Sequence, residues 1–293
     1  MIKQVTIVGG THGNEFTGVY LVKKWKQQSA LIKRESFSTD ILLANVKAYD
    51  KNCRYVDCDL NRQFKLADLE NETFCGEEHL RAKQINEQLG PKGNAKTDFI
   101  IDLHTTTTNM GPNVILPEKG PFYSQLAAYV KMQMPEAVIF CDDNYDSAIE
   151  HHFLSTIAKR SVLVEVGPVP QGVLRQDVFE QSEQLTHILL DFIDFHNQHK
   201  LPTLPKTVTA YRFVESVKLP LDDQGQRRAM IHKHVQDNDF KPLHPGDPIF
   251  RTFDGEDILY QGKTVVYPAF VNEAAYYDNN LAMSLMQQVE LTV

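Results

Sequence analysis

Two histidines and a glutamate stand where the sequence predicts that strands end. His12 and Glu15 follow the apolar run at residues 5–8, and His104 follows a second apolar run at residues 99–101. Because α/β enzymes keep their sites at the carboxyl ends of strands, the three side chains are candidates for one site. Two imidazoles and a carboxylate are ligands that a catalytic Zn²⁺ takes when its fourth position is left for water or substrate.

The spacing of His12 and Glu15 alone is weak evidence, because a histidine and a glutamate three residues apart are more often a surface pair on a helix. The context favours a metal: glycines flank His12, and Asp102 precedes His104 by two residues, where it either supports that ligand or only ends a strand. The glycine-rich residues 9–18 match neither phosphate-binding fingerprint. A second metal is not indicated by the spacing of His151, His152, His196, His199, His232, His234 and His244.

The elements that must position these residues alternate between strands and helices. Strands are predicted at residues 2–8, 40–46, 98–104, 114–116, 137–141 and 161–166, and helices at 17–28, 77–89, 121–134, 153–159 and 176–198. A polar connection at 47–72 has no strong periodicity, and connections of that length are more often functional than idle.

The composition changes at residues 201–205, after which short strand-like runs at 208–217, 228–232, 248–254 and 264–270 are broken by Gly and Pro. We therefore expect an α/β domain at residues 1–203, with a mixed and largely parallel sheet flanked by helices. A smaller β-rich domain at residues 204–293 should follow it.

The overall composition narrows the class of protein. With 293 residues and 42% hydrophobic residues, the chain can bury a full core, and no apolar run reaches the roughly 20 residues that span a bilayer. The formal net charge of −8 argues against a nucleic-acid partner. The four cysteines fit no metal or redox spacing and the chain opens directly into a strand, so we expect reduced thiols in a cytoplasmic protein.

Three further residues could take part in chemistry or in binding. Glu165 is either a strand-end carboxylate paired with an arginine or a general base, whose pKa burial among apolar neighbours would raise. Arg54 and Arg62 are either solvated or form a fork for a carboxylate beside Asn61, since a guanidinium binds a carboxylate through two hydrogen bonds.

Five longer motifs occur in one order along the chain. They are Gly9-Gly-Thr-His-Gly-Asn-Glu15-Phe-Thr-Gly18, Tyr55-Val-Asp-Cys-Asp-Leu-Asn-Arg62, Asp102-Leu-His-Thr105, Glu165-Val-Gly-Pro-Val-Pro-Gln-Gly-Val-Leu-Arg175 and Val271-Asn-Glu-Ala-Ala-Tyr-Tyr277. Together they resemble the aspartoacylase group of the aspartoacylase and succinylglutamate desuccinylase family, relatives of the zinc carboxypeptidases. The resemblance runs from about residue 4 to about residue 278.

The resemblance implies a zinc carboxypeptidase-like fold and one Zn²⁺ per subunit, held by His12, Glu15 and His104. It implies hydrolysis of a small N-acyl-L-amino acid, with N-acetyl-L-aspartate and water giving acetate and L-aspartate. Glu165 matches the family's catalytic glutamate, and Arg54 matches the arginine that polarises the scissile carbonyl and steadies the oxyanion.

The remaining matched residues would contact the substrate. Asn61 and Arg62 would hold its α-carboxylate, and Asp59 would orient one of the arginines. Tyr276, for which ordinary core packing is the alternative, would reach the substrate from the second domain, with Glu273 as a gate or positioning residue. The second domain would then roof the pocket and exclude bulky peptides. The sequence leaves open whether the chain works alone, as a homodimer or as a higher homo-oligomer.

Two positions depart from the family pattern. Ser155 stands where aspartoacylases carry an arginine that pairs with the substrate's side-chain carboxylate, and Asn280 stands where a lysine is expected. An aminoacylase that prefers N-acetyl aromatic or neutral amino acids is therefore an alternative, unless His151 or His152 restores some positive charge. A metal-binding protein without catalysis is the alternative of another class, and it would not need Glu165 beside a metal.

Overall fold

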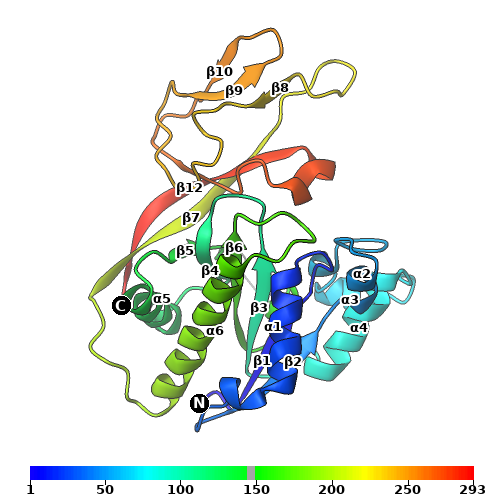
Figure 1. The fold of residues 1–293 in the computed structure, drawn as a ribbon, viewed down its shortest axis with the longest axis vertical. Helices are drawn as coiled ribbons and strands as arrows, with labels where there is room; N and C mark the ends of the chain where they lie inside the picture. Colours follow the sequence, from blue (N-terminus) through cyan, green and yellow to red (C-terminus); the bar gives the residue numbers. More distant parts are fainter. Residues whose placement is uncertain (144–148) are drawn as a thin grey trace.

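The computed structural model describes residues 1–143 and 149–293 (Figure 1). The α-helices are α1 (Phe16–Gln27), α2 (Val46–Asp50), α3 (Leu66–Glu70), α4 (Glu77–Leu89), α5 (Pro121–Gln133) and α6 (Gln176–Asn197), and the 3₁₀ helices are η1 (Ser29–Ile32), η2 (Leu60–Arg62), η3 (Leu154–Ile157) and η4 (Ala274–Asn279). The strands are β1 (Gln4–Gly9), β2 (Ser38–Leu43), β3 (Phe99–Thr105), β4 (Gly111–Leu116), β5 (Val138–Cys141), β6 (Arg160–Gly167), β7 (Thr207–Lys218), β8 (Ala229–Ile231), β9 (Pro248–Thr252), β10 (Asp257–Leu259), β11 (Tyr267–Ala269) and β12 (Leu281–Thr292).

A nine-stranded sheet organises the molecule, in the order β11-β12-β7-β5-β4-β6-β3-β1-β2. The pairs β1–β2, β1–β3, β3–β6, β4–β5 and β5–β7 are parallel, whereas β4 and β6 are antiparallel. The predicted α/β fold with a mixed, largely parallel sheet flanked by helices is confirmed.

The two faces of the sheet are covered differently. Helices α1, α5 and α6 pack on one face, where Ile7, Leu103 and Val164 belong to the largest apolar cluster (Figure 1). The opposite face receives α4, η2 and η3, which pack against Val8 and Ile100. Because both faces are buried, the central strands read as nearly continuous apolar runs. His104 lies on the same face as Ile100, because side chains two residues apart on a strand point the same way.

Glycines allow α1 to begin very close to the end of β1. A Cβ atom on Gly9 would lie 2.2 Å from the carbonyl oxygen of Gly18, so neither strand nor helix could approach this closely with a larger residue at Gly9. Gly10 has a φ of +70°, which a side chain would strain. His12 and Glu15 lie in this tight connection, so they stay close to the end of β1, next to β3.

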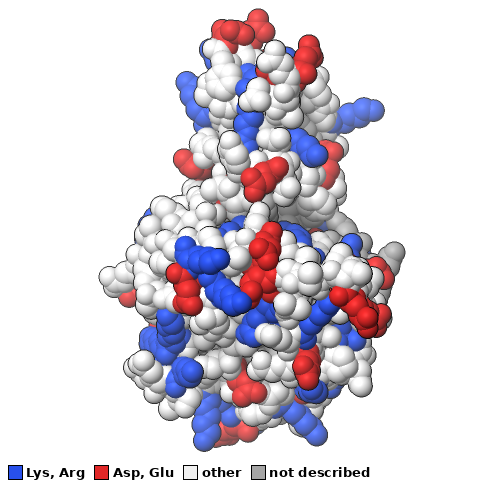
Figure 2. Space-filling view, turned by 90° about the vertical axis from the view of Figure 1, so that its right-hand side faces the viewer, with Lys and Arg blue, Asp and Glu red and all other residues white. Residues whose placement is uncertain are grey.

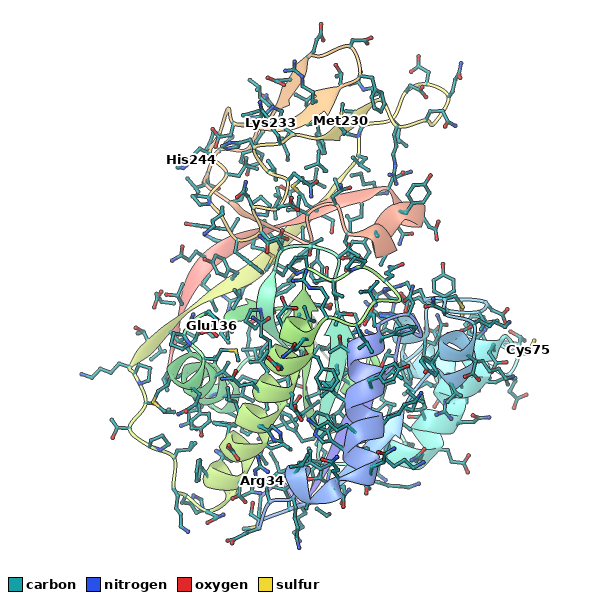
Figure 3. The ribbon with its side chains drawn as sticks, in the orientation of Figure 1. Arg34, Cys75, Glu136, Met230, Lys233 and His244 are labelled. Atoms are coloured by element: carbon teal, nitrogen blue, oxygen red, sulfur yellow. The ribbon has the colours of Figure 1, made fainter. Side chains whose placement is uncertain are left out.

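The C-terminal part is built from long and short strands. The antiparallel strands β7 and β12 continue the large sheet and lead to a separate sheet, β10-β9-β8, which forms the upper end of the molecule (Figure 1). Met230 and Lys233 lie in this upper end (Figure 3). The predicted boundary between residues 203 and 204 falls in the segment between α6 and β7 and stays a prediction, since β7 and β12 belong to the same sheet as the N-terminal strands.

Some predicted elements were wrong in detail. The connection at 47–72 contains α2, η2 and α3, and two of these begin with a side-chain cap: Asn45 accepts a hydrogen bond from Ala48 N and Asp59 accepts one from Asn61 N. Residues 281–292 form β12, which was not predicted because its first half is a continuous buried run without a strand-like alternation. Residues 257–259 form the short strand β10, also unpredicted.

The surface agrees with the mixed charge of the sequence. Figure 2 shows basic and acidic side chains interspersed over one side of the molecule, and no broad basic surface on that side. In the described part of the chain, no helix has the length and apolar character needed to cross a membrane.

Candidate active site and metal centre

The three predicted metal ligands converge at the ends of β1 and β3. His12 Nδ1 lies 2.5 Å from Glu15 Oε1, His104 Nδ1 lies 3.0 Å from Glu15 Oε2, and the two Nδ1 atoms are 3.3 Å apart. Ligands about 2.1 Å from a tetrahedral Zn²⁺ are separated by roughly 3.3 Å, so the donor set has the size of a zinc site. Within residues 1–143 and 149–293, this is the one group of three or more such side chains able to hold a metal ion.

Each histidine has a carboxylate at its other ring nitrogen. His12 Nε2 lies 3.0 Å from Asp59 Oδ1, and His104 Nε2 lies 3.0 Å from Asp102 Oδ2. Asp102 also accepts a hydrogen bond from the Thr11 hydroxyl at 2.8 Å. Such carboxylates fix the orientation of metal-binding imidazoles, and together with Glu15 they gather negative charge that suits a cation.

Glu165 lies next to His104 in the sheet. The two residues are register partners on β6 and β3, and Asn113 on β4 is the partner of Glu165 on the other side. Burial raises the pKa of Glu165 to about 8, an effect that Glu15 and Glu273 reinforce and His104 opposes. The expected burial of this carboxylate is confirmed. Asn113 is buried too, and neither of its side-chain polar atoms has a partner among the described residues.

Arg54 is paired with Glu15, one of the predicted metal ligands, and with Asp59, rather than solvated. Its Nη1 lies 3.3 Å from Glu15 Oε1, while its Nε and Nη2 donate to Asp59 Oδ2 at 3.3 and 3.0 Å. Asp59 thus contacts both Arg54 and His12. Burial raises the pKa of Asp59, but His12 and Arg54 outweigh that effect and hold the pKa well below its usual range.

Asn61 and Arg62 lie on η2 at the wall of the same cavity. Asn61 Oδ1 accepts a hydrogen bond from Leu154 N at 2.8 Å, which leaves the Nδ2 group as its available donor. Arg62 donates from Nη1 to Asn61 O at 3.0 Å, and its guanidinium lies over the ring of Phe153, 5.2 Å from the ring centre.

Tyr276 and Glu273 close the site from the C-terminal part. Tyr276, on η4, lines the cavity and packs against Phe270. The Glu273 carboxylate accepts hydrogen bonds from the Thr106 hydroxyl, from Thr107 N at 2.8 Å and from the Thr107 hydroxyl at 3.0 Å. Because Thr106 and Thr107 directly follow β3, these bonds attach the segment that carries Tyr276 to the strand that carries His104.

The cavity enclosed by these residues has a volume of about 320 Å³. Six of its lining residues have large apolar side chains, and we call them the apolar wall: Ile115, Phe140, Phe153, Leu163, Phe213 and Phe270. Sequence reasoning missed these residues, although the two-residue spacing of Leu163 and Glu165 on one strand was a usable signal. It also missed Asp142, which lines the cavity and whose pKa burial raises to about 6.

The positions that depart from the family pattern supply no cation. Ser155 is fully buried on η3 with no partner for its hydroxyl among the described residues, and the Asn280 side chain accepts a hydrogen bond from Arg227. Burial lowers the pKa of His151 to about 3 and that of His152 to about 4, so both are neutral near pH 7. The hypothesis that one of them supplies positive charge is not supported.

His244 and Cys75 do not belong to the candidate site. His244 is in the upper end of the molecule, and Cys75 is at the edge beyond α4 (Figure 3). The four cysteines are free thiols, and Cys75 is exposed.

Comparisons with known proteins agree with the geometry. Residues 1–193 match the succinylglutamate desuccinylase/aspartoacylase catalytic domain, and residues 206–288 match the barrel-sandwich hybrid domain of the same family. The chain is 45% identical to a probable aspartoacylase of Trichodesmium erythraeum, covering 100% of this chain and 99% of that protein. It is 40% identical to an N-acyl-aromatic-L-amino acid amidohydrolase of Rattus norvegicus, covering 99% of this chain and 92% of that protein.

Among solved structures, murine aminoacylase 3 superposes with a TM-score of 0.93 at 40% identity, covering 100% of this chain and 97% of that one. A succinylglutamate desuccinylase of Vibrio parahaemolyticus shares the fold at 16% identity, with a TM-score of 0.67, covering 98% of this chain and 82% of that one. The chain belongs to the succinylglutamate desuccinylase/aspartoacylase family.

Proposed function

We propose that this protein is a zinc-dependent amidohydrolase that removes the acyl group from N-acyl-L-amino acids. His12, Glu15 and His104 would hold the Zn²⁺, which when bound supplies a Lewis acid for water and for the acyl carbonyl. The spacing of the three ligand atoms and the carboxylates behind both imidazoles support this assignment.

Glu165 acts as the general base and then as the general acid. Its carboxylate takes a proton from the attacking water, whose oxygen bonds to the acyl carbon, and it passes that proton to the amine nitrogen as the C–N bond breaks. A buried carboxylate with a raised pKa suits both steps, since an effective acid–base group has a pKa near the working pH. Arg54 faces the same centre and stabilises the negative charge that develops on the carbonyl oxygen.

Asn61 and Arg62 hold the free α-carboxylate of the substrate. The available Nδ2 group of Asn61 and the guanidinium of Arg62 line the cavity beside each other, which suits a carboxylate with two oxygen atoms. Tyr276 closes the pocket above the substrate. A non-catalytic metal-binding protein would not need Glu165, Arg54 and this carboxylate clamp around one metal site.

We propose further that the preferred side chain is aromatic or neutral rather than acidic. The observation that carries this proposal is the apolar wall beside Glu165, formed by Ile115, Phe140, Leu163 and their aromatic neighbours. Among the described lining residues, Arg54 and Arg62 are the cations with a permanent charge, and both already have roles. A second substrate carboxylate would therefore be buried without a partner, which costs several kcal/mol in rough terms. Relatives named for aromatic substrates support the proposal, whereas those named aspartoacylase keep N-acetyl-L-aspartate as the alternative.

The experiment is a comparison of kcat/KM for N-acetyl-L-phenylalanine, N-acetyl-L-tyrosine, N-acetyl-L-aspartate and N-acetyl-L-glutamate. We expect the aromatic substrates to exceed aspartate by about tenfold or more, and Ser155→Arg to move the preference toward aspartate by about 1–3 kcal/mol. A strong native preference for aspartate would refute the aromatic proposal and leave the deacylase proposal standing. Hydrolysis of none of the four substrates by zinc-loaded protein would refute both.

A further inference from the structure

Lys92 is a buried lysine that the proposed reaction does not use. It follows α4 and is 5% exposed, yet its ammonium group has three acceptors: Phe64 O and His151 O at 2.5 Å and Thr156 Oγ1 at 2.8 Å. An ammonium group is costly to bury unless its hydrogens are all bonded, and here the three acceptors match its three donors. The pKa of Lys92 falls to about 7 because burial disfavours the charged form. The three acceptors thus surround the buried ammonium group of this one side chain.

The acceptors belong to two segments that are far apart in the sequence. Residues 60–66 contain η2, and residues 149–157 contain η3. Further hydrogen bonds join the segments: Phe64 N donates to His152 O at 3.2 Å and Leu66 N donates to Ile149 O at 3.2 Å. The bond from Leu154 N to Asn61 Oδ1 completes the connection. Lys92 therefore donates hydrogen bonds to both segments, and it does so without lining the cavity.

The first of these segments carries the proposed carboxylate clamp, and the second packs against it. One carries Asn61 and Arg62, and the other carries Phe153, over whose ring the Arg62 guanidinium lies. Asn61, Arg62 and Phe153 line the cavity, whereas Lys92 is not among its lining residues. The metal ligands and Glu165 are on β3, β6 and the loop after β1, which Lys92 does not contact through any hydrogen bond among the described residues.

We propose that Lys92 is a positioning residue for the carboxylate clamp: its ammonium group holds the Arg62 segment against the Phe153 segment and so fixes where the substrate's α-carboxylate binds. This inference rests on the proposed function, because it assumes a substrate with a free carboxylate. Loss of the ammonium would leave the buried carbonyls of Phe64 and His151 without this donor, and the two segments would separate or rearrange. Binding of the carboxylate should suffer while the chemical groups stay in place.

The test uses Lys92→Met, which keeps the length of the side chain and removes its charge and donors. Lys96→Met is the matched control, because Lys96 lies in the same connection but is exposed, and its side-chain ammonium donates to Glu87 O. For N-acetyl-L-phenylalanine we expect Lys92→Met to raise KM about tenfold or more while kcat stays within about threefold, as for a lost binding interaction. The control should leave both constants unchanged.

Inhibition by two ligands separates positioning from general loosening. L-phenylalanine has the carboxylate that the clamp would bind, and phenethylamine lacks it. We expect Lys92→Met to weaken inhibition by L-phenylalanine about tenfold and to leave inhibition by phenethylamine unchanged. A fall in kcat at constant KM, or equal weakening of both inhibitors, would overturn the inference.

Thermal unfolding would establish that each variant is folded. If Lys92→Met does not fold, Thr156→Val, which removes one of the three acceptors, must raise KM by a smaller factor, and an unchanged KM contradicts the inference.

The proposed function fails separately, when the native protein hydrolyses none of the N-acetyl amino acids. In that case the affinity for L-phenylalanine, measured by calorimetry in native protein and Lys92→Met, still tests the role of Lys92.

Discussion

Glu165 and His104 are register partners on adjacent parallel strands, so the proposed base and a proposed metal ligand project side by side from one face of the sheet. Neighbouring strands in a sheet lie about 4.8 Å apart. A rigid sheet therefore sets the distance between the two groups, and loop motion does not change it. This arrangement favours an enzyme over a metal-storage site, because a general base must lie within reach of the proton that it moves.

Replacing Glu165 by glutamine should separate chemistry from binding. Gln has nearly the same shape but cannot take a proton, so we expect kcat to fall by about 10²–10⁴-fold while KM changes little. Metal content, measured by atomic absorption, should stay at the native level because Glu165 is not a ligand. Activity within a factor of three of native would remove Glu165 from the role of base.

Removal of the metal should affect activity and stability together. A chelator should abolish hydrolysis, and added Zn²⁺ should restore it. Because the ligands Glu15, His12 and His104 are buried and come together only in the folded chain, Zn²⁺ at 1,000 times its Kd should stabilise the protein by about 4 kcal/mol. The measurement is the Tm with chelator and with Zn²⁺, and His104→Ala should lose the difference. A Tm that does not respond to either would contradict the metal site.

Glu273 should control how well the roof of the site is placed. Glutamine at this position can no longer accept from both Ala275 N and the Thr107 backbone with two oxygens, so one partly buried donor loses its acceptor. We expect Glu273→Gln to lower kcat/KM by about tenfold, whereas the exposed Glu256→Gln should be neutral. Steady-state kinetics of the two variants would check this, and equal values would show that the link from Glu273 to Thr107 is not needed.

The sequence was most informative where both partners of a contact lie in the same short motif. His12 with Glu15 and Arg54 with Asp59 lie within a few residues of each other, and His104 is near the end of the buried strand β3. The strand ends alone therefore bring the proposed metal ligands together. The α/β fold was also predictable, because its central strands are continuous apolar runs with helices between them.

Contacts between distant segments could not be predicted. Lys92 donates to Phe64 O, 28 positions away, and to His151 O, 59 positions away. Asn61 Oδ1 accepts from Leu154 N, 93 positions away. Neither periodicity nor composition predicts such a pair, because each partner is an ordinary loop residue in its local sequence and the two meet only in the folded chain. The apolar wall could not be predicted for the same reason: it combines residues of β4, β5, β6 and β7 with Phe153 and Phe270, which lie outside the strands. Strand β12 became recognisable only through its pairing with β7.

Asp239 gives a pH-dependent prediction for stability. Its Oδ1 accepts a hydrogen bond from Val271 N at 3.1 Å, close to the segment that carries Glu273, while Oδ2 has no partner among the described residues. Burial raises the pKa of this carboxyl to about 7 from an ordinary value of 3.8. The folded protein therefore binds more protons than the unfolded chain between these values, and stability should fall as pH rises from about 4 to about 7.

Asparagine at position 239 is neutral at every pH and should remove this loss. We expect Asp239→Asn to have a free energy of unfolding similar to native at pH 4, where the native carboxyl is protonated in the folded state. At pH 8 the variant should be more stable by about 1–3 kcal/mol, less than the full difference in pKa implies, because local relaxation and water screen a buried charge. Urea unfolding at both pH values would measure the difference, with exposed Asp254→Asn as the control. A variant that is less stable than native at pH 8 would show that the Asp239 carboxylate is well solvated or paired in the folded protein, since only then does its ionisation carry no cost.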